Sequence, residues 1–116
     1  MHNFRELNIW KKSLDLTKLV LNETKSFPED EKYGLISQIN RSAISIPSNI
    51  AEGSGRTTNK DFSRFSDIAK GSSYELETQL IISFEMEYLS QEKFDKLIEH
   101  LNEVQKMLRG FQKTIQ

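Results

Sequence analysis

The chain has no cysteine among its 116 residues, which excludes disulfide bonds and thiolate chemistry. No apolar run approaches the roughly 20 residues that a membrane-spanning helix requires. The first ten residues are polar and lack the apolar stretch of a signal peptide, so we expect a cytoplasmic protein with no membrane contact. An excess of positive charge is also missing. The formal net charge of −1 argues against a strongly basic nucleic-acid binder, although a local basic patch remains compatible with it.

Helical periodicity is the main signal that is present. Apolar residues recur at steps of three and four in segments 7–25, 31–52, 58–88 and 91–114, and no segment alternates as a strand would. The last segment has the longest unbroken series: Phe94, Leu97, Leu101, Val104, Leu108, Phe111 and Ile115. Because the connections are short, the sequence predicts one all-α domain over residues 1–116, an antiparallel up-down-up-down four-helix bundle.

The second segment ends in an unusual way. Pro47 lies inside it and leaves the Ala43 carbonyl without its usual partner, so we expect a kink near Pro47. Gly53 and Gly55 follow and are expected to end the helix, with Gly53 at positive φ.

Three positions in the later segments have a predicted structural role. Thr58 and Ser90 precede the third and fourth segments and should cap them. Gly71, in the middle of the third segment, favours close approach of a neighbouring backbone; the alternative is a notch that binds a ligand.

The second segment also carries a polar face with little charge. Between Tyr33 and Ala51 the only charged residue is Arg41, which is typical of a helix covered by the bundle or by a partner chain. The alternative is an exposed, weakly polar face. Arg41 could pair with Glu52 or Glu75 and fix the register of two helices. We expect a structural or interface cluster formed by Gln38, Arg41, Ser45, Asn49, Glu52, Glu75 and Gln79.

No catalytic or metal-binding pattern is recognisable. His2 and His100 lack a second histidine or a carboxylate at metal-ligand spacing. The turn from Gly53 to Arg56 lacks the Gly-Lys-Ser/Thr ending of a phosphate-binding loop and follows a helix instead of a strand. The sequence therefore predicts a protein that is not an enzyme and needs no metal or cofactor.

Basic residues give one candidate binding site. Arg56, Lys60 and Arg64 are four residues apart and would form one stripe that could contact RNA or DNA phosphates. Additional positive charge comes from the first segment, at Lys11, Lys12 and Lys18. The alternative is a solvated surface, and no aromatic residues alternate with the bases to stack on single strands.

Several motifs together resemble those of the four-helix-bundle or 23S rRNA intervening-sequence protein family of bacteria. The matching stretches are Leu7-Asn8-Ile9-Trp10, Phe27-Pro28 with Glu31 and Tyr33-Gly34-Leu35, Gln38-Ile39-Asn40-Arg41-Ser42, Ser45-Ile46-Pro47-Ser48-Asn49-Ile50-Ala51-Glu52-Gly53, and Ile68-Ala69-Lys70-Gly71-Ser72 with Glu75-Leu76. The resemblance spans nearly the whole chain.

The resemblance implies a bundle that assembles into a homopentamer. Some genes of this family lie in insertions within 23S rRNA genes, and a related group resembles the basic accessory proteins of diversity-generating retroelements. This chain departs from that group in its charge of −1. From the resemblance and the basic stripe we expect a non-enzymatic homo-oligomeric interaction protein associated with RNA or DNA. The alternative is an oligomeric scaffold that binds only protein.

Overall fold

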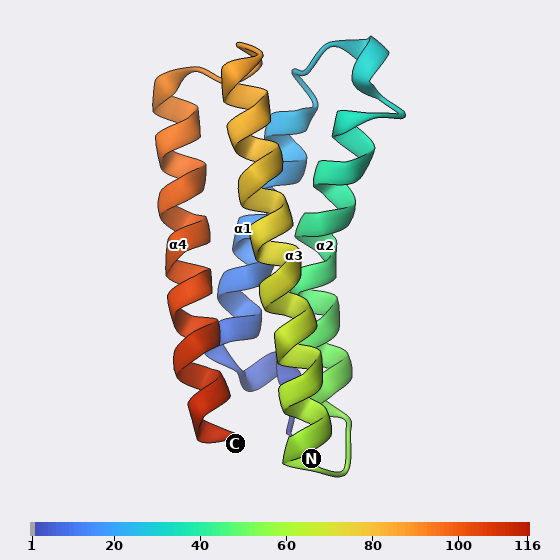
Figure 1. Cartoon of the computed structure of the whole chain (residues 1–116), viewed down its shortest axis with the longest axis vertical. Coiled ribbons are helices and arrows are strands. Elements are labelled where there is room, and N and C mark those ends of the chain that lie inside the picture. Colours follow the sequence, from blue (N-terminus) through green and yellow to red (C-terminus); the bar gives the residue numbers. More distant parts are fainter. Residues whose placement is uncertain (1) are drawn as a thin grey trace.

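Four long helices form the protein in a computed structural model, which describes residues 2–116. They are α1 (Asn8–Thr24), α2 (Leu35–Ser54), α3 (Asn59–Glu85) and α4 (Gln91–Thr114), with short 3-10 helices η1 (Phe4–Glu6) and η2 (Glu29–Glu31). The described residues contain no strand. The predicted all-α four-helix bundle is confirmed. The chain runs upward in α1 and α3 and downward in α2 and α4 in the view of Figure 1.

The helices surround one apolar core. α1 packs against α2 and α4, and α3 packs against the same two helices. Within the described residues no Cα atom of α1 comes within 8 Å of one in α3, so these two helices are diagonal. The following core side chains are fully buried: Leu16, Val20, Ile39, Ala43, Ile46, Ile50, Ala69, Leu76, Leu101 and Leu108. Burial of a Leu or Ile side chain contributes about 1.5–3 kcal/mol, so this core supplies most of the driving force for folding.

The predicted helix caps are confirmed. The Thr58 hydroxyl accepts a hydrogen bond from the Asp61 N–H at 3.1 Å, and the Ser90 hydroxyl accepts one from the Lys93 N–H at 3.2 Å. The second helix begins at Leu35, later than predicted. The reason is that the acidic residues after Pro28 form η2, and Gly34 then has a non-helical backbone with φ −108° and ψ −107°.

Pro47 lies inside a helix that continues to Ser54. The Ala43 carbonyl that Pro47 cannot satisfy has a partner from another helix. The Thr17 hydroxyl of α1 lies 2.9 Å from the Ala43 oxygen and 2.8 Å from the Ser13 oxygen of its own helix. The hydroxyl has one hydrogen, which the Ser13 and Ala43 carbonyls share, so α1 offers α2 a donor in place of the N–H that proline lacks. The kink near Pro47 stays a prediction.

The predictions for Gly53 and Gly71 are wrong. No glycine in residues 2–116 has a positive φ, and Gly53 lies within α2. A Cβ at Gly53 would lie 2.7 Å from Phe62 Cδ1 and 2.8 Å from Phe65 Cβ, so the glycine allows α3 to approach α2 closely. Gly71 behaves in the opposite way: a Cβ there would meet nothing within 4 Å, because this side of α3 faces outward.

Candidate interaction surfaces

The outward side of α3 carries most of the exposed large apolar residues. Five of the seven in the described chain lie on α3 or in the turn after it: Ile68, Tyr74, Ile81, Ile82 and Met86, each 43–55% exposed. Most of their spacings, and the spacings to Gly71, Glu75, Thr78 and Glu85, are three or four residues, which places them on one side of the helix. We call this side, residues 68–86, the α3 outer face. Clusters of exposed apolar side chains rimmed by polar residues often mark interaction sites.

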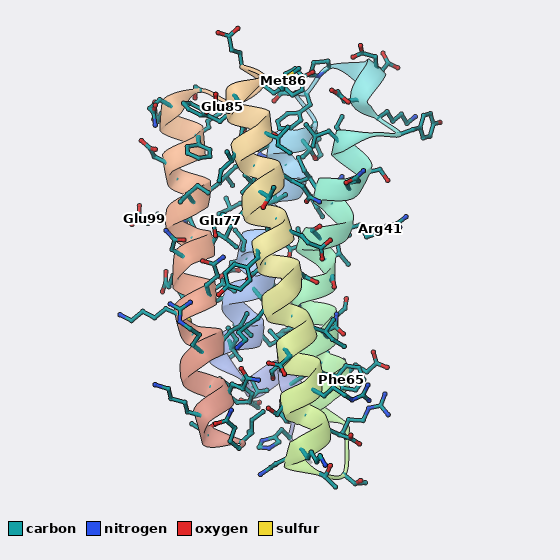
Figure 2. All side chains as sticks on the ribbon, in the orientation of Figure 1. Arg41, Phe65, Glu77, Glu85, Met86 and Glu99 are labelled. Atoms are coloured by element: carbon teal, nitrogen blue, oxygen red, sulfur yellow. The ribbon has the colours of Figure 1, made fainter. Side chains whose placement is uncertain are left out.

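The charge of the α3 outer face is acidic. Glu75 and Glu85 are exposed on it, and there is no base between Gly71 and Glu92. Glu85 and Met86 lie at the end of α3 next to the α3–α4 turn in Figure 2. Sequence analysis predicted only that apolar residues recur at helical steps in segment 58–88. The signal for the second stripe was present at Ile68, Ile81 and Ile82, which lie outside the core spacing.

Part of the predicted polar cluster joins α2 to α3. The Ser45 and Ser72 hydroxyls are 2.8 Å apart, and the Asn49 amide donates to the Ser45 carbonyl and hydroxyl at 2.8 and 2.9 Å. Gln79 is buried in α3, and its Oε1 has no hydrogen-bond partner. Ser72 was missed because only the fold brings this small residue opposite Ser45.

The other members of the predicted cluster are exposed. Gln38, Arg41, Glu52 and Glu75 all face solvent, and Arg41 points away from the bundle in Figure 2. Within residues 2–116 Arg41 forms no ion pair, and Glu52 pairs with Arg56 at 3.2 Å instead. The expected register-fixing ion pair is therefore absent, and the weakly charged face of α2 is open along its outer edge.

The predicted basic residues gather at the α2–α3 turn, but not as one helical stripe. Arg56 precedes α3, which begins at Asn59. The Arg56 and Arg64 guanidinium carbons nevertheless lie over the same Phe65 ring, 4.5 and 5.0 Å from its centroid. This arrangement orients both cations by cation–π attraction. Arg64 also lies 4.0 Å from Asp61.

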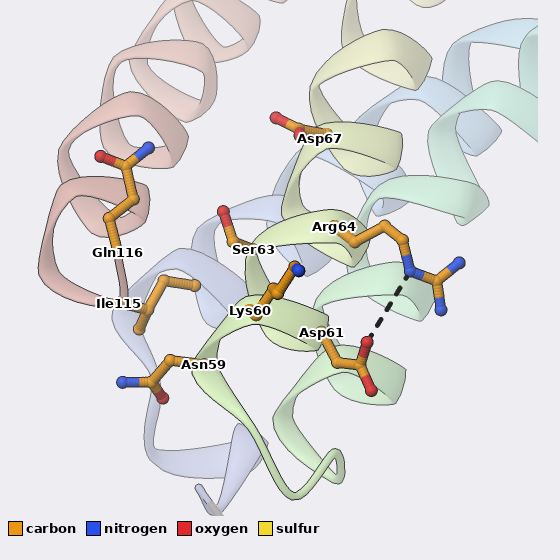
Figure 3. A pocket seen from close by; sticks show the side chains of 8 residues that line it. All are labelled: Asn59, Lys60, Asp61, Ser63, Arg64, Asp67, Ile115 and Gln116. Atoms are coloured by element: carbon orange, nitrogen blue, oxygen red, sulfur yellow. Dashed lines mark ion pairs between the residues drawn. The ribbon is translucent and has the colours of Figure 1, made fainter.

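Two neighbouring depressions extend this basic region. Lys60 and Arg64 line one of about 420 Å³ together with Asp61 and Asp67, as Figure 3 shows, and Gln116 lines it too. The second, of about 250 Å³, is lined by Gln116, Lys70, Arg109 and Lys113. We call Arg56, Lys60, Arg64, Lys70, Arg109 and Lys113 together the basic end. The bases of α4 were missed because they are distant in sequence from Arg56.

The lysines of α1 do not join the basic end. Lys12 pairs with Glu103 of α4 at 3.4 Å, and Lys18 lies 3.9 Å from Asp15. Lys11 is exposed on the same helix. Since no Cα atom of α1 comes within 8 Å of one in α3 among the described residues, these lysines lie apart from the α3 bases of the basic end.

Neither a metal site nor a membrane span emerges from the geometry. Across residues 2–116, no three His, Cys, Asp or Glu side chains lie close enough together to hold a metal ion. None of the described helices combines the length and the apolar character needed to cross a membrane.

Comparison with known proteins relates this architecture to one family. The model of the 23S rRNA-intervening sequence protein family matches residues 5–110. No curated protein matches the chain. A solved structure of a protein with unknown function from the S23 ribosomal protein family of Bacteroides thetaiotaomicron superposes with a TM-score of 0.84 at 27% identity, covering 90% of this chain and 98% of that one. The chain belongs to the 23S rRNA-intervening sequence protein family.

Proposed function

We propose that this protein is a non-enzymatic, cytoplasmic homo-oligomeric interaction protein. The observation that carries the proposal is the α3 outer face, with its exposed isoleucines at positions 68, 81 and 82. Each square ångström of apolar surface removed from water stabilises an assembly by about 25 cal/mol, so covering such a stripe favours association. The weakly charged outer edge of α2 supports the same function. A pentamer is the assembly that the family resemblance favours.

Light scattering coupled to size exclusion tests self-association. We expect a mass several times the 13.5 kDa of the protomer, and about five times if the pentamer forms. Replacement of the exposed Ile81 and Ile82 by Lys should lower that mass. Asn102→Lys on the exposed side of α4 is the matched control and should leave it unchanged. A single 13.5 kDa species for the natural chain would contradict the proposal.

Nucleic-acid binding is the second candidate function, and the basic end favours it. Its bases come from the α2–α3 turn, from α3 and from the last turns of α4. The acidic residues Glu85, Glu87 and Glu92 lie at the other end of α3 and the start of α4, away from the basic end. At the basic end itself Glu52, Asp61 and Asp67 pair with Arg56, Arg64 and Lys70, so a phosphate would compete with these exposed ion pairs. Repetition of this end around an oligomer would raise the effective concentration of sites for a long RNA or DNA.

Fluorescence anisotropy with structured RNA and duplex DNA tests the second candidate. We expect binding at low salt that is largely independent of base sequence, because phosphates are the contacts. The triple variant Arg56→Ala, Lys60→Ala, Arg64→Ala should weaken it. The control triple variant changes Lys11, Lys12 and Lys18 to Ala. If only the control weakens binding, the surface is α1; no binding at low salt favours a scaffold that binds only protein.

A further inference from the structure

A long groove between α1 and α2 is the counterpart of the α3 outer face. Two depressions follow one another along it. The first, about 330 Å³, is lined mainly by apolar side chains, among them Trp10, Leu14 and Ile44. The second, about 650 Å³, is lined by residues that include Leu21, Lys25 and Ile36. We call this surface, from Trp10 to Lys25 on α1 and from Ile36 to Ala51 on α2, the α1–α2 groove.

The lining of the α1–α2 groove has more bases than acids. Lys25 and Lys32 line the second depression. Lys18 instead lines a depression between α1 and α4, where it lies 3.9 Å from Asp15. On α2 the only charged residue between Tyr33 and Ala51 is Arg41. Among the described residues that line the two depressions, Glu29 is the one acid, and it lies at the η2 end. An acidic apolar helix would therefore fit this groove better than a basic one.

We propose that the α3 outer face of one copy docks into the α1–α2 groove of the next copy. The inference rests on the proposed self-association and names the two surfaces that make it. Both surfaces are apolar along the middle, and their charges are opposite, with Glu75 and Glu85 on one and Lys25 and Lys32 exceeding Glu29 on the other. Their lengths are comparable: at 1.5 Å per residue, 68–86 spans about 27 Å and 10–25 about 22 Å.

Contact between identical surfaces is less favourable. Two α3 outer faces would bring Glu75 and Glu85 of both copies together, and neither has a base from Gly71 to Met86. Two grooves would bring Lys25 and Lys32 of both copies together. Like charges across an interface oppose association, so the charges select contact between unlike surfaces. Gly71 supports the same geometry, because the open space at its missing Cβ lets the edge of a groove approach the α3 backbone.

Contact between unlike surfaces has a structural consequence. Each copy uses one surface to bind the copy before it and the other to bind the copy after it. Such heterologous contacts generate a closed ring when the rotation between copies closes, and an open filament when it does not.

A mixing experiment tests the pairing of the surfaces. The face variant carries Ile81→Lys and Ile82→Lys, and the groove variant carries Ile44→Lys and Ser48→Lys; all four positions are exposed, so the fold should survive. Alone, each variant should be a 13.5 kDa monomer. Mixed, they retain one intact face and one intact groove, and should form a dimer of twice that mass. Circular dichroism of each variant checks that it is folded.

Cysteine cross-linking gives a second measurement, since the natural chain has no cysteine. Thr78→Cys alone and Ser48→Cys alone should give few disulfide-linked dimers. A mixture of the two, or one chain with both, should cross-link efficiently. Dimers from Thr78→Cys alone would overturn the proposal in favour of contact between two α3 faces.

The outcomes separate this inference from the proposed function. A monomeric natural chain would overturn both. An oligomeric natural chain whose face and groove variants keep the full mass would overturn only the docking of α3 into the α1–α2 groove. Monomers that stay separate after mixing would overturn it as well.

Discussion

Two buried serines of α3 differ in one respect, the presence of a hydrogen-bond partner. Ser66 and Ser83 are both fully buried. The Ser83 hydroxyl donates to the Gln79 carbonyl at 2.8 Å, whereas the Ser66 hydroxyl has no partner. A buried polar group without a partner costs about 1–3 kcal/mol. We expect Ser66→Ala to raise the free energy of unfolding by about 1 kcal/mol in urea denaturation. Ser83→Ala is the control and should leave it unchanged or lower it.

Tyr88 connects the α3–α4 turn to η2. Its hydroxyl donates to Glu31 Oε2 at 2.8 Å. That hydrogen bond, followed by partial desolvation and the negative charges of Glu31 and Asp30, raises the pKa of Tyr88 above its usual value of 10.0. Because the folded pKa is above the unfolded one, the stabilising contact is complete below pH 10 and is lost as pH rises through the folded pKa.

Removing the negative charge of Glu31 should lower the pKa of Tyr88. Glu31→Gln should move the alkaline rise of tyrosine absorbance near 295 nm to lower pH, since the neighbouring carboxylate no longer opposes ionisation. Tyr88→Phe should remove the portion of the rise that Glu31→Gln shifts. An absorbance curve that Glu31→Gln leaves unchanged would show that the contact does not form in solution.

At the scale of elements, α1 and α2 depend on each other at Pro47. Thr17→Val removes the hydroxyl that reaches the Ala43 oxygen, and should lower the free energy of unfolding by about 1–3 kcal/mol. Pro47→Ala restores an N–H that can donate to the same carbonyl. In that background Thr17→Val should cost less. A double-mutant cycle by urea denaturation measures the coupling, and equal costs in both backgrounds would contradict it.

Gly53 sets the distance between α2 and α3. Alanine favours a helix over glycine, but at Gly53 its methyl group would lie 2.7 Å from Phe62 Cδ1. Gly53→Ala should therefore destabilise the protein by about 1–3 kcal/mol through overpacking. Gly110 in α4 is the matched control, because its missing Cβ would meet nothing within 4 Å. Gly110→Ala should stabilise by about 0.5–1 kcal/mol. Thermal unfolding of both variants compares the two effects.

The elements show which features sequence alone could predict. Periodicity and caps are local signals, so the four helices, the Thr58 and Ser90 caps and the bounds of α4 were predicted well. The role of Gly53 depends on Phe62 and Phe65 across a helix interface, and the position of Thr17 opposite Ala43 depends on how α1 docks. Such contacts between helices have no local signature, so they required the fold.

In the candidate surfaces, too, only residues close in sequence were predicted as one group. Arg56, Lys60 and Arg64 were predicted as one group because they are close in sequence. Lys70, Arg109 and Lys113 join the basic end only because α4 ends next to the start of α3. Sequence analysis placed the lysines of α1 with the nucleic-acid contacts, whereas the bundle sets Lys12 beside Glu103 of α4 and Lys18 in a depression between α1 and α4.

Over the whole molecule, the two proposed interactions rely on different forces, so salt should separate them. Three phosphate contacts at Arg56, Lys60 and Arg64 predict a loss of affinity of about 40-fold between 50 and 200 mM salt, because counterion release drives binding. The α3 outer face buries isoleucines, and apolar burial is not screened by salt, so the oligomer should keep its mass over the same range. Light scattering and RNA anisotropy on one sample measure both. Dissociation of the oligomer in step with RNA release would mean that charge pairs, not the isoleucines, hold the copies together.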